Sequence, residues 1–196
     1  ADLARPELKG RLCMRSGSNI YNLSLLGGMI EKIGAEKAEA WAKGVVENLS
    51  KEPAGGDSDQ IKSLAAGECA VTVANTYYFV RFLSSDKPED KAVADKVQWI
   101  FPDQAGDGAH VNISGAGVAK HAPNRDAAVQ FLEYLASPEA QVYFAKGNNE
   151  YPVAGGETGN AALDQLGAFK ADTLNVAAYG RNQKAAQEIM DRVGWK

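Results

Sequence analysis

The sequence predicts an α/β fold, and the order of its apolar patterns is the main reason. A short apolar, β-branched run at residues 70–74 has the composition of a buried strand in a parallel sheet. A second short run, residues 11–15, precedes a turn of small polar residues and then helical patterns. A strand, helices and a further strand in this order are typical of a doubly wound α/β lobe.

The helices between the two strands are predicted from the spacing of apolar residues. The first covers residues 20–33, where apolar side chains recur every three or four positions. The second covers residues 36–49 and turns Trp41 toward the core. A glycine-rich loop leads to a short capped helix at residues 58–66, which ends at Gly67.

The second half of the chain alternates extended segments with helices. Its expected elements are a polar connector at 84–96, a strand at 97–102, a glycine-rich extended segment at 111–118 that can cross between lobes, a helix at 124–136, a helix opened by Pro138, a loop at 148–159 and a helix at 182–193. The pair Gly115-x-Gly117 lacks the third glycine of a dinucleotide fingerprint, so we discount a nucleotide site there.

Composition narrows the function classes. The net charge is −4, from 21 basic and 25 acidic side chains without any basic block, which argues against a nucleic-acid partner. No stretch approaches the roughly 20 apolar residues of a membrane helix. The opening residues 1–6 are typical of a loop in the middle of a fold, so we expect a further segment ahead of them.

The two cysteines, Cys13 and Cys69, leave two interpretations open. They do not form a C-x-x-C pair, and two cysteines alone cannot complete a zinc site. They are either two buried free thiols or one disulfide between two strands, and the disulfide would require an oxidising compartment.

A turn of small polar residues, 16–19, predicts an anion site between the first strand and the first helix. The first amides of a helix lack partners, and the positive end of the helix dipole points into such a turn. Arg15 ends the strand and has a planar fork that suits an anion. The alternative is that serine and asparagine only cap the helix and that Arg15 is a solvated surface residue.

Two adjacent tyrosines, Tyr77 and Tyr78, follow the strand at 70–74, where open α/β sheets place their ligands. Tyr21, in the first turn of the first predicted helix, lies beside the anion site predicted at the 16–19 turn. Neighbouring residues on a strand point to opposite faces, so both can reach one metal only if the chain bends at residues 75–76. The alternative is that the pair simply covers the strand end, which is common for tyrosine.

Three motifs together resemble one family. They are Arg-Ser-Gly-Ser-Asn-Ile-Tyr-Asn at 15–22, Gly-Gly-Asp-Ser-Asp-Gln-Ile-Lys at 55–62 and Asn-Thr-Tyr-Tyr at 75–78. The chain resembles the periplasmic ferric-ion-binding proteins that feed ABC importers, a branch of the two-lobed solute-binding proteins. The likeness continues through residues 108–118 to the closing Asp-Arg-Val-Gly-Trp, and the tyrosine pair is its most specific part.

The resemblance implies a type II periplasmic-binding-protein fold, with most of the first lobe missing from this chain. Family members begin with a further stretch that forms much of that lobe and often supplies a ligand, so we expect a carboxyl-terminal portion. We expect residues 1–97 to form the second lobe, 98–150 to belong largely to the first lobe, and 151–196 to return to the second. The implied location is the periplasm, and the implied partner is the membrane permease of an ABC importer.

In this family tyrosine phenolates hold the metal, and the carry-over falls on Tyr21, Tyr77 and Tyr78. The chemistry agrees, because ferric iron is a hard ion that prefers anionic oxygen. A free phenol, with a pKa of about 10, is neutral at pH 7, but a bound cation deprotonates it. Three phenolates balance the three charges of Fe³⁺, and a small synergistic anion, carbonate or similar, completes the shell.

The resemblance also implies the supporting residues. The expected anion-binding residues are Arg15, Ser16, Gly17, Ser18 and Asn75. Asp57 is expected to orient this network from a position behind the ligands.

The implied compartment is oxidising, which favours a disulfide between Cys13 and Cys69.

Two other functions compete with ferric-iron binding. A receptor for a bare oxyanion such as phosphate would use the 16–19 turn without metal, but three phenolates would repel its ligand. An enzyme is disfavoured because neither His110 nor His121 lies in a recognisable base or metal motif. The serines of the turn also lack the G-x-S-x-G elbow of hydrolases.

Overall fold

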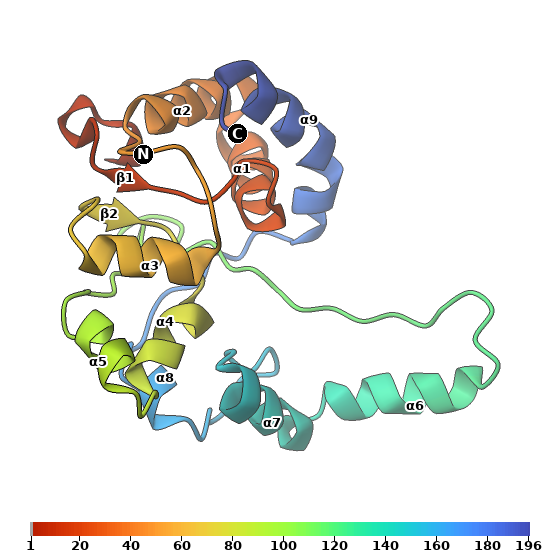
Figure 1. Cartoon of the computed structure of the whole chain (residues 1–196). Coiled ribbons are helices and arrows are strands. Elements are labelled where there is room, and N and C mark those ends of the chain that lie inside the picture. The colour runs from red at the N-terminus through yellow and green to blue at the C-terminus, as the bar shows by residue number, and fades with distance from the viewer. Residues whose placement is uncertain (1) are drawn as a thin grey trace.

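The structure is a computed structural model, which describes residues 2–196 (Figure 1). Its elements, in chain order, are the 3₁₀ helices η1 (Asp2–Ala4) and η2 (Pro6–Leu8), the strand β1 (Leu12–Cys13), the helices α1 (Ile20–Ile33), α2 (Ala35–Glu47) and α3 (Asp57–Ala65), the strand β2 (Val71–Thr72), and the helices α4 (Thr76–Leu83), α5 (Pro88–Ala94), α6 (Arg125–Leu135), α7 (Pro138–Asn148), α8 (Ala161–Asp164) and α9 (Ala177–Val193).

The strands β1 and β2 pair in parallel, as expected for an α/β lobe, with Leu12 opposite Val71 and Cys13 opposite Thr72. Leu12 also forms a single parallel bridge to Leu49 after α2. Both strands are shorter than predicted, because each finds only one or two residues of partner backbone. The strand expected at 97–102 does not form, and these residues follow an irregular path.

The disulfide between Cys13 and Cys69 is confirmed, with Cα atoms 5.7 Å apart. It ties β1 to the residues that lead into β2, so the two strands that precede the tyrosine-bearing helices are covalently joined. Both cysteines are buried.

The main core lies between α1, α2 and α9. Buried aliphatic residues from all three helices, among them Leu26, Val45 and Ile189, pack together with Leu12 of β1. Figure 1 shows α9 folded back across α1 and α2, so that the last helix covers the first two. Helix α9 begins at Ala177, five residues before the predicted start at 182.

A smaller apolar cluster forms around α3, α4 and α5, where Ile61, Phe79 and Phe82 are buried. Residues 84–96, predicted as a polar connector, contain the helix α5. Its start follows the usual signals, since Pro88 occupies the first turn and two acidic residues follow it. The prediction was wrong because this helix has no buried residue and therefore no clear apolar period.

Helix α6 lies within one residue of its predicted bounds, 124–136. In the structure it buries no residue, and Phe131 is 59% exposed. Figure 1 shows a long extended segment that leads from the body of the molecule to α6. Across the described residues 2–196, no helix is both long and apolar enough to cross a membrane.

Candidate metal centre

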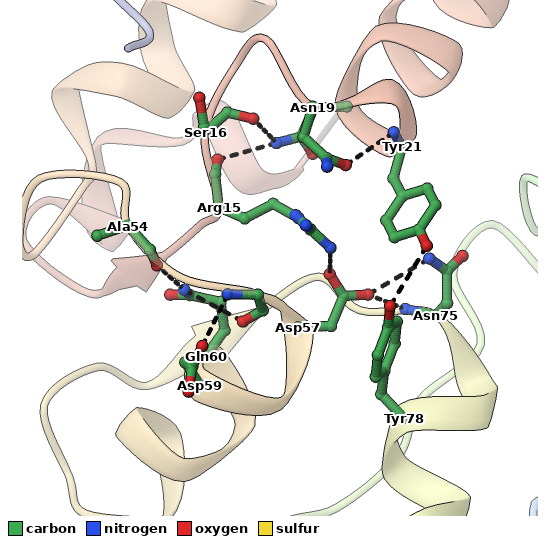
Figure 2. Close-up of polar contacts among 12 residues, drawn as sticks. Arg15, Ser16, Asn19, Tyr21, Ala54, Asp57, Asp59, Gln60, Asn75 and Tyr78 are labelled. Atoms are coloured by element: carbon green, nitrogen blue, oxygen red, sulfur yellow. Dashed lines mark hydrogen bonds and ion pairs between the residues drawn. The ribbon is translucent and has the colours of Figure 1, made fainter.

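The hydroxyl groups of Tyr21 and Tyr78 lie 3.3 Å apart, although 57 positions separate the residues in the sequence. Tyr21 lies in the first turn of α1 and Tyr78 in the first turn of α4, so the amino-terminal ends of two helices meet here. Figure 2 shows the two hydroxyl groups pointing toward one another. Helix amino-terminal ends favour negative charge, so a bound anion or the negative charge of metal-bound phenolates would be stabilised here.

Tyr77 lies against Tyr78, with ring centroids 4.6 Å apart. The chain turns at Asn75, as the two-tyrosine site requires, but both tyrosines then lie on the helix α4 and not at a strand end. Residues 76–83 form a helix because Phe79, Val80 and Phe82 bury one face of it. Successive residues of a helix are rotated by about 100° around its axis, so the side chains of Tyr77 and Tyr78 can both reach a metal on one side of α4.

Burial raises the pKa of Tyr77 and of Tyr78 above the ordinary value for tyrosine, and the neighbouring Tyr21 raises both further. The phenols are therefore neutral at pH 7 without a cation. Arg81 lies on the next turn of α4, with its guanidinium carbon 4.9 Å from the centre of the Tyr78 ring. Sequence reasoning missed Arg81 because the tyrosines were placed on a strand, where a residue three positions away is not a neighbour.

Asp57 joins two of the predicted anion-binding residues. Its Oδ1 accepts a hydrogen bond from Arg15 Nη1 at 2.7 Å, and its Oδ2 accepts one from the Asn75 amide at 2.8 Å (Figure 2). Asp57 is 2% exposed, so this carboxylate is held away from water by one cation, one main-chain amide and the side-chain amide of Asn75 at 3.3 Å. It is the first residue of α3, whose start is fixed by Asp59 accepting from the Gly56 amide at 2.8 Å.

The polar turn at 16–19 is partly used by the protein itself. The Ser16 and Ser18 hydroxyl groups are 2.9 Å apart and exposed. The Gly17 amide donates to the main-chain oxygen of Lys196 at 3.0 Å. Asn19 caps α1 by accepting from the Tyr21 amide at 2.9 Å, as the capping alternative supposed. Arg15 is paired with Asp57 and is not the solvated surface residue of the other alternative.

In the described part of the chain, no three or more histidine, cysteine, aspartate or glutamate side chains are placed to hold a metal ion. His110 is far from this role, since burial lowers its pKa to about 4 and its ring packs on Tyr179 with centroids 4.8 Å apart. His121 is exposed. Phenolic oxygens are thus the candidate ligands for a hard cation.

The sequence matches the model of a family described as bacterial extracellular solute-binding protein, over residues 1–170. The iron uptake protein A1 of Synechocystis is 46% identical over 195 residues, and the match covers 100% of this chain and 54% of that protein. The major ferric iron-binding protein of Neisseria meningitidis serogroup B is 25% identical over 194 residues. The chain therefore spans about half the length of the curated relatives it matches.

Solved structures of iron-binding proteins also match this chain. The FutA protein of Trichodesmium, solved in complex with iron and citrate, superposes with a TM-score of 0.96 at 53% identity, over 100% of this chain and 62% of that one. The ferric binding protein of Campylobacter jejuni superposes with a TM-score of 0.93 at 40% identity, and the match covers 62% of that chain.

Proposed function

The chain belongs to the bacterial extracellular solute-binding protein family, and from this premise we propose that it binds ferric iron through Tyr21, Tyr77 and Tyr78. The fold is that of the type II periplasmic ferric-binding proteins, of which this chain spans about 60%. The family consists of solute-binding proteins and not of enzymes, which bears out the expectation that this chain is not an enzyme.

The observation that carries the proposal is the meeting of Tyr21 and Tyr78 at 3.3 Å with Tyr77 packed beside them. Three neighbouring phenols at two helix amino-terminal ends form a set of hard oxygen donors that a trivalent cation can deprotonate. The relatives support the choice of metal, because their names refer to iron uptake and ferric iron binding.

We propose that a small synergistic anion, carbonate or similar, completes the iron shell. The exposed hydroxyl groups of Ser16 and Ser18 are the donors that we propose for this anion. Arg15 and Asn75 are bound to Asp57, so in this proposal they act through that carboxylate and position the site. Because Gly17 donates to Lys196, it shapes the turn and leaves the anion to its neighbours.

We further propose that the protein works in the periplasm, where it would deliver iron to the permease of an ABC importer. The disulfide supports an oxidising compartment. We propose that residues 1–97 and 151–196 form one lobe and that residues 98–150 belong largely to another. The packing of α9 on α1 and α2 supports the first part of this division. The exposed face of α6 supports a packing partner for residues 98–150. We propose that this partner is an amino-terminal segment of the same protein.

Titration with ferric citrate tests the metal assignment. We expect a purple-to-red absorption band, because charge transfer from phenolate to Fe³⁺ absorbs visible light. Inorganic phosphate without iron serves as the control and tests the oxyanion-receptor alternative. Tight phosphate binding together with a colourless iron titration would replace ferric-iron binding by that alternative.

A further inference from the structure

We propose that Trp195 is a positioning residue of the iron site, which holds the turn at 15–18 from behind. The inference rests on the proposed function and deepens it. Trp195 lies directly after α9 and is 2% exposed, so its ring belongs to the main core and not to the site surface.

Two hydrogen bonds and one close approach join the end of α9 to this turn. The Trp195 indole Nε1–H donates to the Arg15 carbonyl at 3.1 Å, and the Gly17 amide donates to the Lys196 main-chain oxygen at 3.0 Å. A side chain at Gly17 would place its Cβ 2.2 Å from the Trp195 carbonyl oxygen. Only glycine allows the two backbones to lie this close, so the turn and the Trp195 segment fit as one unit.

The contact reaches the proposed ligands through Arg15. Its carbonyl accepts from Trp195 and also from the Asn22 side chain at 2.9 Å, so the backbone of Arg15 is held from two sides. Its guanidinium then binds Asp57 at 2.7 Å and lies 4.8 Å from the centre of the Tyr21 ring. Loosening the Arg15 backbone would therefore shift its guanidinium, which lies directly against the ring of Tyr21. The shift would also reach the turn at Asn75, because Asp57 binds both Arg15 and the Asn75 amide.

A second tryptophan provides a matched comparison. Trp41 of α2 is buried beside Trp195, with ring centroids 6.3 Å apart, but its Nε1 has no hydrogen-bond partner among the described residues. Replacing either by phenylalanine removes the same atoms from the same core. Only the change at Trp195 removes a bond to the turn.

The experiment compares Trp195→Phe with Trp41→Phe in the full chain. We expect both variants to lose stability in the iron-free form, with the larger loss in Trp195→Phe because it also removes a hydrogen bond. Ferric iron should dissociate faster in Trp195→Phe alone, by up to about tenfold, the equivalent of one lost hydrogen bond. The absorption maximum of the iron complex should also shift in that variant alone. Equal iron dissociation and equal spectra in the two variants would overturn the positioning role.

Amide hydrogen exchange of the iron-free variants separates this inference from the proposed function. Faster exchange at residues 16–19 in Trp195→Phe than in Trp41→Phe supports the positioning role even if the wild-type protein fails to bind iron. Equal exchange there contradicts it. Gly17→Ala gives a second variant, which should mimic Trp195→Phe because its new methyl group pushes the two backbones apart.

Discussion

At the scale of single residues, the proposed site depends on the protonation of buried phenols. Burial raises the pKa of Tyr77 and Tyr78, so both hydroxyl groups carry protons in the iron-free protein. A ferric ion must displace these protons to gain anionic ligands, and protons must compete with iron for the same oxygens.

Iron affinity is therefore expected to fall as the pH falls. Binding should release protons, which a pH-stat measures when ferric ion is added to a weakly buffered solution. The colour should be lost on acidification while the far-ultraviolet dichroism of the protein stays unchanged. Full occupancy and intact colour well below neutral pH would argue against binding dominated by phenolates.

Replacing each proposed ligand by phenylalanine keeps the ring and removes one oxygen. We expect Tyr21→Phe, Tyr77→Phe and Tyr78→Phe each to weaken ferric binding by more than the 10- to 100-fold typical of outer-shell changes. The exposed Tyr134 and Tyr143 are the controls and should tolerate the same change with unaltered affinity. If Tyr78→Phe binds ferric iron with wild-type affinity and colour, the three-tyrosine assignment is wrong.

His110, whose ring packs on Tyr179, makes the stability of the protein depend on pH. Burial lowers its pKa to about 4; Asp172 opposes this lowering and Lys32 adds to it. The unfolded chain, in which the pKa is about 6.5, binds the proton first as the pH falls. Stability should thus decline between about pH 6.5 and 4, by up to about 3 kcal/mol.

The decline is measured by denaturant unfolding at several pH values. It should be reduced in His110→Gln and unchanged in His121→Gln, because His121 is exposed. An equal pH dependence in the two variants would show that other groups are responsible.

At the scale of elements, local patterns predicted the longer helices but missed α4, α5 and α8. The bounds of α1 match the prediction because its apolar residues keep a helical period through both ends. The strand at 97–102 was wrong because a strand needs a partner backbone, which a single-sequence pattern does not reveal. The tyrosine pair was placed on a strand for a related reason, since residues 76–83 are aromatic on nearly every face.

Several of the candidate residues lie together in the structure, but sequence patterns did not predict all of their contacts. The motifs singled out Tyr21 and Tyr78, and the structure brings their hydroxyl groups together. Asp57 was expected behind the ligands, but its pairing with Arg15 joins positions 42 residues apart, which local periodicity does not encode. Trp195 was noted only as the end of a motif, because its indole bond to Arg15 spans 180 positions.

The disulfide that joins β1 to the residues before β2 can be removed by substitution or by reduction. Cys13 and Cys69 are separated by 56 positions, and closing a loop of this size stabilises by about 4 kcal/mol in the chain-entropy model. We expect Cys13→Ser/Cys69→Ser to lose stability of this order in denaturant unfolding. Reduction of the wild-type protein should have the same effect, and it should leave the double variant unchanged. A wild-type midpoint that does not respond to reduction would contradict this role.

At the scale of the whole molecule, the first and last helices form one body that carries Tyr21, while Tyr77 and Tyr78 lie on α4 beside the smaller apolar cluster. Helix α9 packs on α1 and α2, and the ion pair of Arg192 with Glu39, at 2.6 Å, lies along this contact. Residues 112–123 lead away from this body to α6, which buries none of its residues (Figure 1). The proposed ligands thus come from the well-packed part of the chain, while α6 and its approach form a separate arm.

The most direct test of the three-tyrosine site is an anomalous difference map from crystals of the iron-loaded protein, collected at the iron absorption edge. We predict one strong peak bounded by the hydroxyl oxygens of Tyr21, Tyr77 and Tyr78. A peak elsewhere in the molecule, or a peak that contacts only one of these three oxygens, would contradict the assignment.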